Sequence, residues 1–175
     1  LELWREPVDL IVDRKGLIVV LDYEGGDTRQ GSIWELRSGV PGGRELPLDP
    51  NLFRDPVGIA CDLANDLYLC DPIFGGGSNP NGGAVLRMRR TNPVGYVIAT
   101  SHPSLRQPVD CCLASNGNVF IADRDANPAN LPPGDHGAIF ELNPATARLE
   151  VASASAVLKQ PDGIASVVTP DLTGS

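Results

Sequence analysis

The chain has 175 residues, of which 42% are hydrophobic and 21% charged, as in an ordinary single globular domain and unlike a disordered segment. Its formal net charge of -8 disfavours nucleic acid and membrane surfaces as partners, because either would require a basic stripe on the protein. Nineteen glycines and sixteen prolines cut the sequence into short pieces, which argues against long helices.

The sequence gives no sign of a membrane anchor. No window approaches 18 consecutive apolar residues, so we expect no transmembrane helix. No signal peptide is recognisable and the chain begins at Leu1, so we expect either a removed leader or a longer parent chain. The cellular location stays open, with an extracellular or periplasmic protein favoured.

The first predicted elements are short β-strands joined by turns. Runs rich in Val, Ile and Leu predict two strands around a turn that ends at Gly16, and a third strand follows a Gly-rich loop. A turn that closes on glycine favours positive φ, which glycine tolerates at the least cost. The expected strands of this unit are 9–13, 17–22 and 31–37, with a weaker fourth in 44–48.

The same pattern returns along the chain, so the sequence is built from repeats. The string "PVDLIVDRKGLIVVLD" (7–22) has full partners in "PVGIACDLANDLYLCD" (56–71) and "PVDCCLASNGNVFIAD" (108–123). A fourth, broken copy begins with "PDGIASVV" (161–168). In the two later full copies Asn65 and Gly117 take the place of Gly16. Their further strands are expected at 83–89, 95–100, 137–143 and 147–153.

Each unit predicts a four-stranded antiparallel meander. Such a sheet cannot bury both faces alone, and radial stacking of copies solves this, so we expect an all-β fold made of β-propeller blades. A β-sandwich is the alternative, but it would not require the same string three times. We expect one partial propeller domain over 1–175: about three blades plus the first strand of a fourth, in an incomplete ring. The predicted repeats are 7–55, 56–107 and 108–160, with 161–175 starting a fourth.

The repeated strings resemble the NHL-repeat pattern and the related SMP-30/gluconolactonase-like propellers, from Pro7 to Val168. In those propellers a P-x-G-I-A-x-D element leads to an N-G-x-[LV]-Y-V-A-D element. The resemblance implies a ring of about six blades. That superfamily includes scaffolds, lactonases, lyases and synthases, so it implies no single function. Three units leave three alternatives: a fragment of a longer propeller, half of a two-copy ring, or a subunit whose 161–168 strand adds to a neighbour.

Asp22, Asp71 and Asp123 end the second strand of each repeat, in one register. They could act as metal ligands. A residue that recurs in every blade is better explained as architectural, fixing the turn by side-chain-to-backbone hydrogen bonds. We therefore expect a structural role for this set.

A second set of aspartates is the candidate metal site. Asp9 and Asp110 share a register at the start of the innermost strand, and Asp162 lies one residue off it in the fourth copy. In a propeller this strand lines the central channel, where a ring of carboxylates could hold a hard cation such as Ca²⁺. The resemblance implies a divalent cation there that activates water or polarises the substrate. The glutamate and asparagine ligands of that pattern have no clear counterpart here, so the candidate ligands are these three aspartates and no catalytic residue is assigned.

The four cysteines stand at strand positions that are apolar in the other repeats, so we expect small buried hydrophobic residues. The adjacent Cys111 and Cys112 point to opposite faces of a strand and cannot converge on one metal. A disulfide from Cys70 to either of them stays open, because it would need their Cα atoms within about 7 Å.

Two functions follow from the sequence. The favoured one is a non-catalytic scaffold that binds a protein partner or associates with itself to complete the propeller. The alternative is a divalent-metal-dependent, lactonase-like hydrolase or lyase that uses the channel carboxylates. The regular repeats and the lack of a recognisable catalytic constellation in the sequence favour the first.

Overall fold

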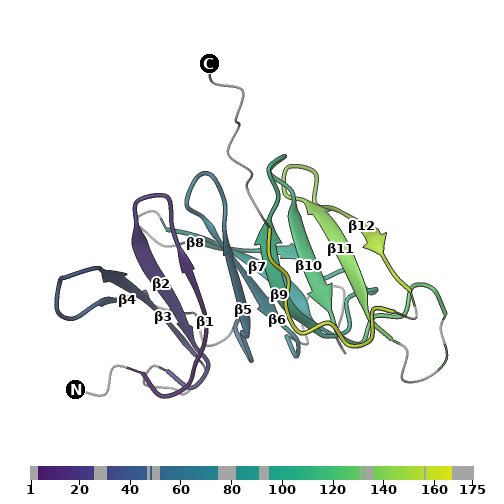
Figure 1. Ribbon diagram of the computed structural model, residues 1–175, viewed down its shortest axis with the longest axis horizontal. Helices are drawn as coiled ribbons and strands as arrows, with labels where there is room; N and C mark the ends of the chain where they lie inside the picture. The colour runs from purple at the N-terminus through teal and green to yellow at the C-terminus, as the bar shows by residue number, and fades with distance from the viewer. Residues whose placement is uncertain are drawn as a thin grey trace.

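The computed structural model of the chain describes residues 4–25, 31–46, 48, 52–74, 82–90, 95–130, 132, 136–155 and 157–166. Three four-stranded antiparallel sheets form within these residues (Figure 1). The strands of every sheet follow the chain order, so every sheet is a meander. None of the described residues forms a helix that is long and apolar enough to span a membrane.

The three sheets are the blades of the fold, and their strands are as follows. Blade 1 consists of β1 (Pro7–Val12), β2 (Leu17–Asp22), β3 (Ser32–Arg37) and β4 (Arg44–Leu46). Blade 2 consists of β5 (Gly58–Cys61), β6 (Leu67–Asp71), β7 (Ala84–Arg89) and β8 (Gly95–Thr100). Blade 3 consists of β9 (Pro108–Leu113), β10 (Val119–Asp123), β11 (Ala138–Asn143) and β12 (Arg148–Ser153).

The predicted all-β, blade-like fold is confirmed. Every strand predicted up to residue 153 has a counterpart, and the weak fourth strand of the first repeat is the short β4. The turn residues Gly16, Asn65 and Gly117 have φ values of 74°, 65° and 85°. These values lie in the left-handed region, which glycine and asparagine enter most readily. The tight turn between the first two strands of each blade therefore explains the residue type at that position.

Two hydrophobic layers join the blades. On β5, Ile59 belongs to the layer shared with blade 1 and Ala60 to the layer shared with blade 3, because successive strand residues point to opposite faces. The first layer includes Val19, Leu21, Ile33, Leu67, Leu69 and Leu86. The second includes Tyr68, Cys70, Val85, Ile121, Phe140 and Leu142. Blade 2 is therefore buried on both faces by its two neighbours.

A buried aspartate ties down the chain that enters each blade. Asp22 accepts hydrogen bonds from the backbone N–H groups of Arg5 and Glu6, at 2.8 and 3.0 Å. The same pair of bonds runs to Asp71 from Arg54 and Asp55, and to Asp123 from Arg106 and Gln107. All three aspartates are fully buried. Each donor pair lies 17 and 16 residues before its acceptor, so the bonds repeat with the blades and support the architectural interpretation.

Residues 157–166 pass β9 after the end of blade 3 (Figure 1). The backbone N–H of Gln160 donates to the His136 carbonyl at 2.8 Å, and that of Ile164 donates to Asp110 Oδ2 at 2.8 Å. The predicted first strand of a fourth blade is thus held beside β9, but residues 161–166 are not part of a strand. A strand is defined by a ladder of paired backbone groups, and the bond to Asp110 is to a side chain. Residues 167 and 168 of that prediction lie outside the described residues.

Replacing Asp123 with Asn is expected to lower the free energy of unfolding by about 3 kcal/mol. Asp123 Oδ1 accepts three backbone N–H bonds and Oδ2 accepts a fourth, so an amide NH₂ would face a buried donor in either orientation. Urea denaturation followed by circular dichroism measures the change.

The same substitution at the exposed Asp125 is the matched control and is expected to change the stability little. Equal stability of Asp123→Asn and the wild-type chain would contradict the architectural role.

Candidate functional site

The inner strands of the three blades border a concave surface, on the side that faces the channel of a propeller. β1, β5 and β9 lie next to one another (Figure 1), and together with residues 164–166 they surround a cavity of about 650 Å³. Most of its wall is apolar strand. The groups that could bind a ligand there include Asp9, Asp110, Cys61 and Cys112.

Asp9 and Asp110 have equivalent backbone partners. Oδ1 of each accepts the N–H of the following residue, at 2.7 Å in both cases. Oδ2 of Asp9 accepts the N–H of Ile59 at 2.8 Å, and Oδ2 of Asp110 accepts that of Ile164 at 2.8 Å. Each carboxylate therefore links its own inner strand to the next segment around the channel.

Glycines occupy the same register in the segments that receive these links. Gly58 and Gly163 each precede the isoleucine whose N–H is the donor. A Cβ at Gly58 would lie 2.6 Å from the Cα of Asp110 and from the carbonyl oxygen of Val109. At Gly163 it would lie 3.6 Å from Asp110 Oδ2, which is ordinary contact. Asp9 and Asp110 therefore reach the next segment through their side chains. Gly58 has no side chain, which lets the backbone of β9 approach β5 closely.

The two carboxylates share one electrostatic environment. Burial raises the pKa of Asp9, the Ile59 N–H opposes the rise, and the negative charge of Asp110 adds to it. Burial also raises the pKa of Asp110, and its two backbone donors oppose that rise. A cation beside both groups would relieve their repulsion. The metal site therefore stays a prediction. Of its predicted ligands, Asp9 and Asp110 border the same cavity.

Asp162, the third predicted ligand, lies apart from the other two. Its exposed carboxylate forms an ion pair with Arg124 and borders a different hollow, which also contains Tyr23 and Asp55. Within the described part of the chain, no group of three or more His, Cys, Asp or Glu side chains is placed to hold a metal ion. The fold thus brings together two of the three predicted ligands.

Two thiols that border the cavity, those of Cys61 and Cys112, have raised pKa values. Burial raises the pKa of Cys61 to about 11 and shifts that of Cys112 in the same direction. The thiolate is the form that attacks electrophiles and binds metals, so both side chains are poor nucleophiles and poor ligands as they stand. Sulfur chemistry therefore adds no reactive group to the cavity.

A buried arginine near Cys61 connects blades 1 and 2. The side chain of Arg90 is 8% exposed, donates to Asp13 Oδ2 at 2.8 Å and also pairs with Glu35. The partners lie 77 and 55 residues away in the chain. Nothing in the basic run 87–90 distinguishes this arginine from its neighbours, so sequence reasoning missed it.

Comparison with known proteins identifies the type of fold but not the activity. No family model matches the chain, and no curated protein matches it either. Among the solved structures that do match is one described as a "putative gluconolactonase", with a TM-score of 0.53 and 16% identity. The alignment covers 86% of this chain and 49% of that one, so this chain spans about half the length of its structural neighbour. At this identity the likeness shows the β-propeller-like fold and nothing finer.

Replacing Gly58 with Ala is expected to lower the free energy of unfolding by about 3 kcal/mol, since the new methyl group would overlap the backbone of β9. Urea denaturation measures the change.

Gly163→Ala is the matched control, because it adds the same methyl group in the same register with ordinary contact distances. It is expected to cost less than about 1 kcal/mol. If both variants were equally stable, the close approach of the second and third inner strands would be wrong.

Proposed function

We propose that the chain is a non-catalytic β-propeller scaffold that associates with a second copy of itself through one open sheet face of blade 1. The observation that carries the proposal is the exposure of Leu10. Its side chain is 59% exposed, whereas its counterparts in blades 2 and 3, Ile59 and Cys111, are 2% and 3% exposed. The repeat builds the same face three times, and in blade 1 no sheet among the described residues covers it.

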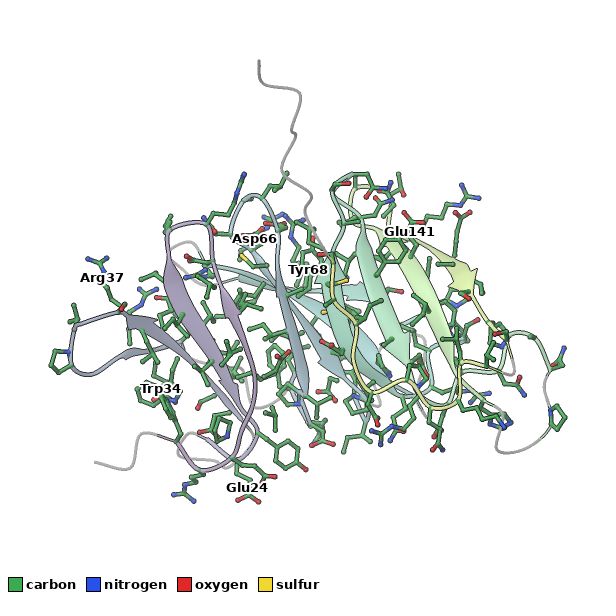
Figure 2. All side chains as sticks on the ribbon, viewed as in Figure 1. Glu24, Trp34, Arg37, Asp66, Tyr68 and Glu141 are labelled. Atoms are coloured by element: carbon green, nitrogen blue, oxygen red, sulfur yellow. The ribbon has the colours of Figure 1, made fainter. Side chains whose placement is uncertain are left out.

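Strand pairing arranges this face in two apolar rows across blade 1. Each row crosses the sheet from β1 through β2 to β3, along residues that pair directly with one another. The two rows are two residues apart on every strand, so they lie on the same face. We call the six residues of both rows the open face: Leu10, Val20 and Trp34, then Val12, Ile18 and Leu36. Leu10 and Val12 are exposed, Ile18, Trp34 and Leu36 are half-buried, and Val20 is buried. Val12 is 65% exposed, and Figure 2 shows Trp34 on the side of blade 1 away from blade 2.

The row equivalent to Leu10, Val20 and Trp34 is buried in the other two blades. The first row corresponds to Ile59, Leu69 and Leu86 in blade 2 and to Cys111, Ile121 and Phe140 in blade 3. These rows belong to the layers that join each blade to the one before it. A contiguous apolar surface left exposed on a soluble domain marks an interaction site. The open face therefore fits a partner that is itself a β-sheet.

The structures at blade 1 and beside blade 3 favour one way in which two copies could associate. Blade 1 has all four of its strands, so it lacks a covering sheet and not a strand, which argues against donation of 161–168 to a neighbour. Head-to-tail closure would bring Asp9 of one copy towards Asp110 of the other, where residues 161–166 already lie. Like charges at such a contact are unfavourable. We therefore infer that two open faces meet across a two-fold axis, the commonest symmetry of dimers.

The purified chain is expected to show twice the 18.5 kDa mass of one chain in multi-angle light scattering. Leu10→Glu is expected to return it to the mass of one chain, because the interface would bury a carboxylate without a partner.

Val40→Glu is the matched control, since Val40 is 55% exposed and lies outside the open face, in the turn between β3 and β4. It should leave the mass unchanged, and circular dichroism checks that both variants fold. A folded wild-type chain with the mass of one chain would contradict the proposal.

A second candidate is a lactonase-like, metal-dependent hydrolase or lyase. The channel cavity favours it, because Asp9 and Asp110 border the cavity and repel each other there. The structural neighbour described as a gluconolactonase also supports it, at the level of the fold. In this candidate Asp9 and Asp110 are the proposed ligands of Ca²⁺, which would supply a Lewis acid for water or a carbonyl group, whereas Asp162 borders a different hollow.

This candidate predicts one Ca²⁺ bound per chain in calorimetric titration, and hydrolysis of gluconolactone that requires the ion. Asp110→Ala should abolish both, whereas Asp125→Ala, at an exposed aspartate outside the cavity, should preserve both. A titration without heat together with no hydrolysis would eliminate the candidate and leave the scaffold proposal standing.

A further inference from the structure

Two of the four cysteines lie against each other between blades 2 and 3. Cys70 on β6 is fully buried and Cys111 on β9 is 3% exposed, both within the hydrophobic layer that joins these blades. The neighbouring Cys111 thiol adds to the rise in the pKa of Cys70 that burial causes. Cys111 Sγ also lies 3.6 Å from the carbonyl oxygen of Tyr68, a residue that Figure 2 shows between the two blades.

The backbones that carry the two thiols come close at the same point. Cys70 pairs directly with Gly58 across the β5–β6 ladder. A Cβ at Gly58 would lie only 2.6 Å from the Cα of Asp110, the residue before Cys111. A disulfide requires Cα atoms within about 7 Å and side chains directed at each other. The close approach at Gly58 and the shared hydrophobic layer bring the strands that carry Cys70 and Cys111 together at the two thiols.

The other two cysteines are placed differently. Cys112 follows Cys111 on one strand and so points to the opposite face of β9, whereas Cys61 packs against the hydrophobic layer between blades 1 and 2. Cys61 Sγ lies 3.5 Å from the carbonyl oxygen of Asp62 and 3.7 Å from Asn65 Oδ1. The geometry therefore selects one pair among the four thiols.

We propose that Cys70 and Cys111 form a disulfide between blades 2 and 3 when the chain folds in the presence of a small disulfide oxidant such as oxidised glutathione. The thiolate of one cysteine attacks oxidised glutathione, which forms a mixed disulfide and releases one glutathione. The second cysteine then attacks the protein sulfur of that mixed disulfide and releases the other glutathione. The chain loses two protons and two electrons, and two molecules of reduced glutathione carry them away.

Because both thiols are buried in the folded chain, we expect the disulfide to form while the chain folds. In the folded chain burial raises the pKa of Cys70 well above its usual range, which holds it as a thiol, and its surroundings keep the oxidant out. During folding both sulfurs are still accessible. Once formed, the disulfide is shielded from reductants in the same hydrophobic layer and fixes blade 3 to blade 2.

Refolding the full chain from urea in a glutathione redox buffer tests the proposal. Thiol titration is expected to fall from the four free cysteines to two per chain. Peptide mapping without reduction is expected to join the peptide of Cys70 to that of Cys111. The oxidised chain should melt roughly 5–10 °C above the reduced chain, because the cross-link restricts the unfolded state.

A Cys61→Ser/Cys112→Ser double variant is the matched control and should form the same disulfide and show the same rise in melting temperature. Cys70→Ser should show neither. Four free thiols in the refolded wild-type chain, a mapped bond to the peptide of Cys61, or loss of the bond in the folded double variant would overturn the proposal.

Discussion

A carboxylate at the end of the second strand fixes where each blade begins. Asp22, Asp71 and Asp123 are buried, and each binds the backbone N–H groups of two residues that lead into the inner strand. Without the carboxylate these donors would be left unpaired, at about 1–3 kcal/mol for each one that is buried. The inner strand starts where these bonds place it, so the channel cavity and the open face both depend on them.

The features that could be predicted from the sequence are local ones, formed by residues that recur at the same positions in every repeat. The turn at Gly16 and the role of Asp22 follow from a string that returns with each blade, and Asp9 and Asp110, which share a register, border one cavity. The bonds between blades could not be predicted. The N–H of Ile59 meets Asp9 across 50 residues, and Arg90 meets Asp13 across 77. Such partners depend on the angle and offset at which two sheets pack, and no local pattern encodes either.

The scaffold proposal and the metal hypothesis make different uses of the same carboxylates. Asp9 and Asp110 already link their own inner strands to the next segment around the channel, a structural role that does not require a metal. Both retain lone pairs that a cation could use. What separates the two accounts is the exposure of blade 1, because an assembly explains why Leu10 is exposed while its counterparts Ile59 and Cys111 are buried.

Hydrogen–deuterium exchange at increasing protein concentration tests this central claim most directly, because it reports which backbone segments the association covers. The account predicts that the amides of residues 7–22 and 32–37, which carry the open face, become more protected as the concentration rises. Residues 119–123 of β10, in blade 3, should exchange at an unchanged rate. Protection of the blade 1 segments that does not depend on concentration would contradict association through the open face.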